Sequence, residues 1–124
     1  MPILKLYKDK NIDCKMDLVS IEDHLIKMMN TELNTRLENC QIIWIVTEIL
    51  KSEYKIYGEL LLRKNENRTN LIKNNFLNKI GKKLSKSFST NIRLRSFSIK
   101  DKLINAAQIK FCLLYTSPSP RDGW

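Results

Sequence analysis

The chain has 124 residues, of which 43% are hydrophobic, and 22 Lys and Arg against 13 Asp and Glu give a formal net charge of +9. No apolar run reaches the roughly 18 residues that a membrane span requires, so we expect one soluble domain and no membrane partner. Cys14 and Cys40 lack the spacing of a CxxC pair or a zinc site, which predicts no disulfide framework and no metal site, and suits a reducing cytoplasm.

The first expected element is an apolar strand from Pro2 to Tyr7. Methionine before a small residue such as proline is normally trimmed, so the mature chain is expected to begin with a free prolyl amine at Pro2. This secondary amine, held at a strand end beside cations, is able to act as a base near neutral pH. If Met1 remains, the same nitrogen belongs to an amide and is not basic.

A helix is expected from Asp17 to Leu37, with Asp17 or Ser20 as its cap. Its apolar positions recur every three or four residues, as one buried face requires: Leu18, Ile21, Leu25, Met28, Met29 and Leu33. A second strand follows, centred on Ile42 to Val46. This pattern predicts a first β-α-β unit whose two strands are parallel.

A second β-α-β unit is expected to start around Tyr57, with Leu60 to Leu62 as its first strand. A polar turn, Asn65 to Asn70, ends in the possible caps Thr69 and Asn70. The next helix carries apolar residues at a four-residue step, namely Ile72, Phe76, Ile80, Leu84 and Phe88. A long strand, Ile92 to Ile99, and a short extended end, Lys102 to Phe111, complete the unit.

The last segment differs in composition from the rest of the chain. Residues Cys112 to Asp122 resemble a translated sequencing adapter, and the lysine- and asparagine-rich composition stops at Phe111. We therefore expect residues 1–111 to form a single domain and residues 112–124 to be an artefactual tail. A disordered Pro/Ser tail is the alternative.

The two expected units form a four-stranded mixed sheet with two helices on one face, an α/β fold (α+β in some schemes). Two helices cover only one face of such a sheet. The run from Ile42 to Val46 is apolar without alternation, which predicts burial on both faces. Because no other segment is left to cover the second face, the sequence predicts self-association.

Taken together, these features resemble the tautomerase superfamily, whose members share an amino-terminal proline and one or two β-α-β units. The segment Ile45 to Glu59 is similar to 4-oxalocrotonate tautomerase, with Thr47-Glu48 and Gly58-Glu59 in the matching places. The doubled length, together with Arg68 before the second helix and a Ser-Phe pair in the last strand, is more similar to 5-carboxymethyl-2-hydroxymuconate isomerase. Similarity to macrophage migration inhibitory factor is fainter.

This resemblance implies a homotrimer and a cofactor-free keto-enol tautomerase or isomerase that acts on small acidic enols or unsaturated keto acids, as in aromatic degradation. It implies that Pro2 is the catalytic base, that Arg68 binds a substrate carboxylate, and that Tyr54 lines the pocket. Each residue also has a plainer interpretation: Pro2 as a tolerated first strand residue, Arg68 as a solvated turn residue, and Tyr54 as packing between subunits.

One departure from the family pattern, together with the net charge of +9, leaves an alternative open. Ile43 stands where the shorter family has an arginine in its second strand, and Arg36, at the expected end of the first helix, is the candidate replacement. The alternative is a non-catalytic trimeric binding protein with a basic surface. We interpret the lysine-rich face of the second helix, Lys79 to Lys86, as a solvated surface rather than a nucleic-acid site. The lone His24 is likewise interpreted as a solvated residue.

Overall fold

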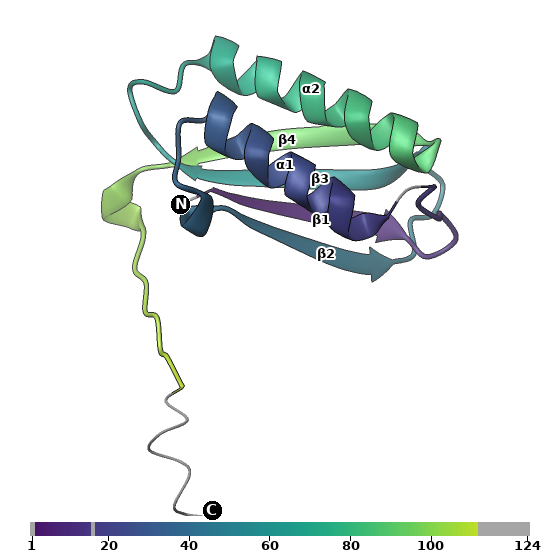
Figure 1. Cartoon of the computed structure of the whole chain (residues 1–124), viewed down its shortest axis with the longest axis horizontal. Helices are drawn as coiled ribbons and strands as arrows, with labels where there is room; N and C mark the ends of the chain where they lie inside the picture. The colour runs from purple at the N-terminus through teal and green to yellow at the C-terminus, as the bar shows by residue number, and fades with distance from the viewer. Residues whose placement is uncertain (1, 16, 112–124) are drawn as a thin grey trace, which may run out of the picture.

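A computed structural model of the chain describes residues 2–15 and 17–111, and the expected adapter-derived tail lies outside them. The described chain contains one four-stranded sheet and two helices packed on it (Figure 1). The strands are β1 (Ile3–Asp9), β2 (Gln41–Thr47), β3 (Tyr54–Arg63) and β4 (Asn91–Ile99), in the order β2-β1-β3-β4. The pairs β1–β2 and β3–β4 are parallel and β1–β3 is antiparallel, which confirms the predicted pair of β-α-β units.

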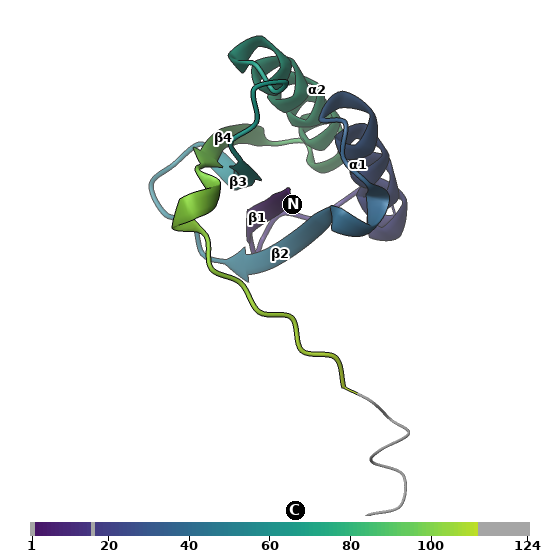
Figure 2. The same ribbon diagram turned by 90° about the vertical axis from the view of Figure 1, so that its left-hand side faces the viewer.

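Both helices, α1 (Leu18–Glu32) and α2 (Asn70–Phe88), lie on the same side of the sheet (Figure 2). Their predicted apolar faces form the core with the inward side chains of the two central strands. The fully buried members include Leu4, Leu6, Ile21, Leu25, Ile56, Leu60, Phe76 and Ile80. Thr69 caps α2 as predicted, since its hydroxyl accepts a hydrogen bond from the Ile72 amide at 3.3 Å.

The predicted end of the first helix was wrong. The helix stops at Glu32, and Asn34 takes the left-handed conformation with φ 51°, which asparagine tolerates. Leu33 is the last buried apolar residue of this stripe, so a longer helix would gain no further stabilising contact with the core. Arg36 therefore lies in an exposed segment immediately before the short 3₁₀-helix η1 (Leu37–Asn39), and not at the end of α1.

Two further boundaries differ from those predicted. β3 begins at Tyr54, before the expected start near Tyr57, so the central strands pair over a greater length. The expected extended end opens with a 3₁₀-helix, η2 (Asp101–Leu103), and residues 104–111 form no strand as they run away from the sheet (Figure 1). Within the described ranges, no helix is long and apolar enough to span a bilayer.

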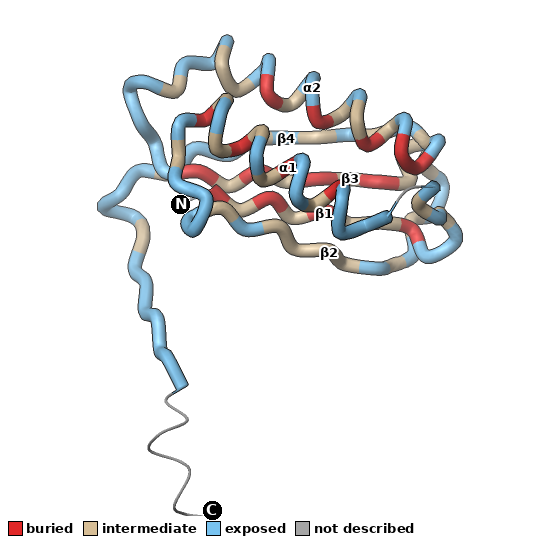
Figure 3. The backbone as a smooth tube through the Cα atoms, viewed as in Figure 1, coloured by how far each residue is buried: buried red, intermediate tan, exposed pale blue. Residues whose placement is uncertain are grey.

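The sheet face opposite the helices is not covered by the described chain (Figures 2 and 3). It carries the alternate residues of each strand, and Phe97 there is 41% exposed. Ile43 and Ile45 are only partly buried, so the two-sided burial predicted for β2 is incomplete in a single copy. We call this surface the open face; its side chains are Ile3, Lys5, Tyr7, Ile43, Ile45, Tyr57, Glu59, Leu61, Arg93, Arg95 and Phe97.

Candidate functional site

The strand directions define two ends of the sheet. At the first, which we call the Pro2 end, β1 and β2 begin while β3 and β4 finish. At the second, the Tyr54 end, β1 and β2 finish while β3 and β4 begin. The candidate residues divide between these two ends.

Pro2 is fully buried and immediately precedes the central strand β1. Its carbonyl oxygen accepts a hydrogen bond from the Gln41 amide at 3.1 Å, which extends the β1–β2 ladder by one residue. Because β1 has a hydrogen-bonded neighbour on each side, the position of this ring is fixed by the sheet.

Arg68 lies at the same end as Pro2. Its Nε donates a hydrogen bond to the Leu33 carbonyl at 3.2 Å, and its Nη1 donates one to the Arg63 carbonyl at 3.3 Å. Arg63 is two residues beyond Leu61, the β3 partner of Ile3. The guanidinium thus ties the end of α1 to the end of β3 at the sheet end that holds Pro2, and it retains further N–H donors.

Cys40 is a neighbour of this group that sequence reasoning did not assign to the site. Its thiol is partly buried and donates to the Arg36 carbonyl at 3.3 Å. Desolvation raises the pKa of Cys40, and the positive charge of Arg68 opposes that rise. The signal was its place immediately before Gln41, the first residue of the strand paired with β1.

Tyr54 lies at the other end of the sheet. Seven residues separate it along β3 from Leu61, the partner of Ile3, which corresponds to about 23 Å of extended strand. One copy of the chain therefore brings Pro2 and Arg68 to one end but does not bring Tyr54 to them.

A hollow of about 360 Å³ occupies the Tyr54 end, lined by Tyr7, Thr47, Ile49, Ser52, Tyr54, Tyr57, Arg93 and Arg95. The guanidinium of Arg93 lies 4.4 Å from the centre of the Tyr54 ring, and that of Arg95 lies 5.8 Å from the Tyr57 ring. The rings of Tyr7 and Tyr57 stack with centroids 5.9 Å apart. Two cations and three aromatic rings thus share one small hollow.

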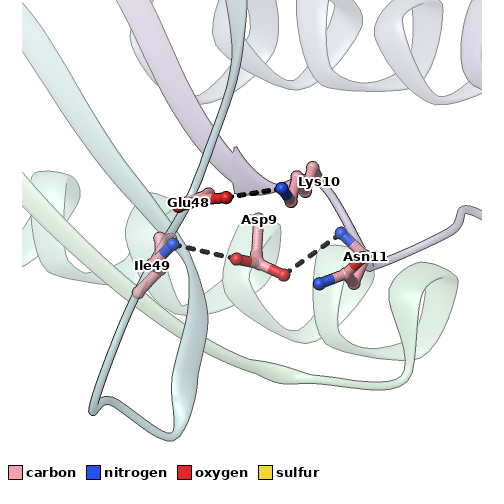
Figure 4. A network of polar contacts seen from close by, with 5 residues as sticks. All are labelled: Asp9, Lys10, Asn11, Glu48 and Ile49. Atoms are coloured by element: carbon pink, nitrogen blue, oxygen red, sulfur yellow. Dashed lines mark hydrogen bonds and ion pairs between the residues drawn. The ribbon is translucent and has the colours of Figure 1, made fainter.

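The carboxylate of Asp9 holds Ile49, one of the residues that line the hollow (Figure 4). Its oxygens accept hydrogen bonds from the Ile49 amide at 2.8 Å and the Asn11 amide at 3.1 Å. These two hydrogen bonds, of which the one from Ile49 has the larger effect, hold the pKa of Asp9 below its ordinary value. Beside them Lys10 pairs with Glu48, so the loop after β2 is tied to the end of β1 twice.

Arg93 and Arg95 were also absent from the sequence-based site. They alternate along β4 and therefore lie on the open face beside Tyr57 and Glu59. Their period-two spacing in the last strand was the available signal. The pKa of Tyr57 is raised by desolvation and by the Glu59 carboxylate, which accepts a hydrogen bond from the Tyr57 hydroxyl at 2.9 Å.

The remaining candidates lie apart from both ends. His24 is exposed on α1, as predicted, and Lys79 on α2 pairs with Glu32 at 2.9 Å. Over residues 2–15 and 17–111, no group of three or more His, Cys, Asp or Glu side chains is placed to hold a metal ion.

Comparison with solved structures identifies the fold. A fused 4-OT protein described as the W0 wild-type symmetric trimer superposes with a TM-score of 0.70 at 18% identity, over 85% of this chain and 93% of its own. The chain has the tautomerase fold. N1, a member of the cis-3-chloroacrylic acid dehalogenase family, matches with a TM-score of 0.68 at 11% identity, over 96% of this chain and 93% of its own.

A macrophage migration inhibitory factor-like protein from Entamoeba histolytica also shares this fold, with a TM-score of 0.62 at 8% identity, over 89% of this chain and 98% of its own. No family model and no curated protein sequence matches the chain. The predicted fold class is therefore confirmed by structure, at identities that show the fold alone.

Proposed function

We propose that the chain is a cofactor-independent tautomerase that loses Met1 and uses the Pro2 nitrogen as a general base, most similar in type to 5-carboxymethyl-2-hydroxymuconate isomerase. The observation that carries this proposal is the position of Pro2: a fully buried ring at the start of a central strand, at the same end of the sheet as Arg68. The fold shared with fused 4-OT supports it.

The surroundings of Pro2 favour a neutral amine. Burial disfavours the protonated form of an amine in general, and so does a nearby positive charge. A base is most efficient when its pKa lies near the working pH. Loss of Met1 converts the Pro2 nitrogen from an amide to this amine and opens it on the side where the peptide bond stood.

The reaction moves a proton within one substrate. The Pro2 lone pair takes the proton of an enol hydroxyl, the O–H electrons form the carbonyl, and the double-bond electrons shift toward the far carbon. The protonated Pro2 then returns the proton to that carbon. Nothing is oxidised or reduced, and the amine is regenerated.

Arg68 suits a small acidic substrate, such as an enol or unsaturated keto acid of aromatic degradation. Its free N–H donors provide charge-assisted hydrogen bonds to a carboxylate at the Pro2 end. Tyr54 reaches the same site only from a second copy, because it lies about 23 Å along β3 from the Pro2 end in its own chain.

Self-association into a homotrimer is part of the proposal. The open face carries Ile3, Ile43, Ile45, Leu61 and Phe97, an apolar set that neither helix covers. A second copy would remove these side chains from water, at about 25 cal/mol for each Å² buried. A symmetric trimer is the described state of one fused 4-OT with this fold.

The test combines a mass spectrum of the purified chain with assays on phenylenolpyruvate and 2-hydroxymuconate. We expect loss of Met1, measurable ketonisation, and a fall of at least roughly 100-fold in kcat/KM for Pro2→Ala, the usual scale of general-base catalysis. Asn74→Ala, an exposed change on α2, is the matched control and should leave the rate unchanged. Retention of Met1, or full activity in Pro2→Ala, would contradict the proposal.

Two observations favour the non-catalytic alternative. Ile43 occupies the place of the expected strand arginine, and Arg68 already donates hydrogen bonds to the Leu33 and Arg63 carbonyls. Under that alternative neither substrate turns over, and the basic chain binds an acidic partner such as DNA in a strongly salt-dependent way. Absence of DNA binding at low salt would remove it.

A further inference from the structure

The second helix carries a row of positive charge on the side away from the core. α2 contains five lysines and neither Asp nor Glu. Four of these lysines follow the positions i, i+3, i+4 and i+7, and we call them the lysine row: Lys79, Lys82, Lys83 and Lys86. Because a helix rises about 1.5 Å per residue, the row extends over roughly 10 Å along one side of α2.

Most of this charge is not balanced by a carboxylate. Lys79 pairs with Glu32 of α1 at 2.9 Å. No carboxylate of residues 2–15 and 17–111 lies within 4.0 Å of the Nζ atom of Lys82, Lys83 or Lys86. Like charges four residues apart, as in Lys82 and Lys86, destabilise a helix. The row therefore holds three ammonium groups together against their mutual repulsion, which a bound anion would relieve.

The lysine row also borders a concave surface. Lys82, Lys83 and Lys86 line a hollow of about 550 Å³ together with Ser85. Lys82 and Lys86 are exposed, and Lys83 is half-buried. An anionic group in this hollow can therefore contact more than one ammonium group. Of the described residues that line it, none belongs to the open face, the Pro2 end or the Tyr54 end.

The position of the row decides which partner fits it. Self-association through the open face leaves the row uncovered, because α2 lies on the opposite side of the sheet (Figure 2). The apolar stripe of α2, which includes Phe76, Ile80 and Leu84, is buried in the core. A membrane-surface helix inserts such a stripe into the lipid, so α2 has no apolar face left for a membrane. Lysine binds phosphate as a point charge, which favours a phosphate-rich polymer.

We propose that the lysine row binds the phosphate backbone of a nucleic acid without reading its sequence. A DNA duplex carries one phosphate per roughly 3.4 Å of its axis on each strand, so the roughly 10 Å of the row matches about three phosphates of one strand. The sequence favoured a solvated surface; the hollow and the missing carboxylates are what the structure adds. The inference does not rest on the Pro2 reaction.

The test is a fluorescence anisotropy titration of the full chain into a short labelled DNA duplex between about 50 and 200 mM salt. We expect the logarithm of the binding constant to fall linearly with the logarithm of the salt concentration, with a slope of about −3 for about three phosphate contacts. Two duplexes of unrelated sequence should bind equally, because lysine contacts to phosphate carry no sequence information.

Substitutions in the row locate the binding site. The triple variant Lys82→Gln, Lys83→Gln and Lys86→Gln should bring the salt slope close to zero and weaken binding at about 50 mM salt by at least roughly tenfold. Glutamine has a helix propensity similar to that of lysine, so the variant should keep the wild-type circular dichroism spectrum. Arginine at the same three positions keeps the charge and should retain binding.

A matched variant separates a local site from an effect of net charge. Lys51→Gln, Lys100→Gln and Lys110→Gln together also remove three positive charges, all at exposed positions outside α2, and should leave the salt slope unchanged. Pro2→Ala should bind DNA as the wild type does. Equal weakening by the two glutamine triples, absence of DNA binding at about 50 mM salt, or binding to phosphatidylserine vesicles but not to DNA would each overturn the proposal.

Discussion

The Pro2 end and the Tyr54 end are built from the same strands in opposite directions, yet they carry different chemistry. The Pro2 end has a buried ring, one arginine that already donates to two carbonyls, and the partly buried Cys40. The Tyr54 end has a hollow with two arginines and three tyrosines. A repeated β-α-β unit therefore fixes the backbone at both ends while leaving their side chains free to differ.

The largest effect on both ends is expected from a substitution in the core that they share. Leu6 is fully buried in β1, between the two ends, and Leu6→Ala should lower the free energy of unfolding by about 2–5 kcal/mol. Urea denaturation followed by circular dichroism measures this loss. Leu50→Ala, at a side chain that is 75% exposed, should change stability by less than about 0.5 kcal/mol. Equal effects of the two changes would contradict the core assignment.

A smaller effect is expected at Gly58, where β3 lies tightly against its neighbours. A Cβ there would stand 2.5 Å from Leu94 Cδ2 and 2.8 Å from Leu6 Cδ2, so Gly58→Ala should destabilise by about 1–3 kcal/mol. Gly81→Ala is the matched change. Its nearest atom is 3.4 Å away and it lies within α2, so it should stabilise by about 0.5–1 kcal/mol. Thermal melts compare the two; stabilisation by Gly58→Ala would refute the close approach.

A substitution at Arg68 tests the Pro2 end without changing a residue of the Tyr54 end. If Arg68 binds the substrate carboxylate, Arg68→Ala should raise KM roughly tenfold, the scale of one charge-assisted hydrogen bond. Lys27→Ala, at an exposed position on α1, is the control. An unchanged KM in folded Arg68→Ala would leave Arg68 with its structural contacts alone.

The smallest expected effect concerns Asp9 at the Tyr54 end. Its pKa is lowered in the folded chain, so its contribution to stability is complete above the unfolded pKa of about 4 and is lost as the pH falls through the lower folded value. Asp9→Asn should therefore lower the melting temperature at pH 7 and flatten its decline in acid. A melting curve at several pH values tests this, and an unchanged acid profile would contradict it.

The fold was predictable because its signals are local and repeated. The stripe Ile72, Phe76, Ile80 and Leu84 indicated α2, and the two β-α-β units followed from chain order. The end of α1 was not predictable from the stripe alone, because the left-handed conformation of Asn34 decides it.

The site was less accessible from the sequence. Pro2 was chosen from its position and from family resemblance, and its role remains a proposal. Arg93 and Arg95 were missed because only the register of β4 against β3 places them beside Tyr54 and Tyr57. Long-range register of this kind joins residues that are far apart in the chain.

The most direct measurement is covalent labelling with 2-oxo-3-pentynoate, which inactivates another protein of this fold, Pt0534. An unprotonated Pro2 amine should add to the alkyne carbon remote from the ketone, with the proton passing to the adjacent carbon, so the chain gains the mass of the whole reagent. Peptide mass spectrometry is predicted to place this single adduct on Pro2, and the activity should fall in parallel with labelling. The same reagent should give no adduct in Pro2→Ala. Labelling at Cys40 or at lysines with Pro2 unmodified would contradict the account.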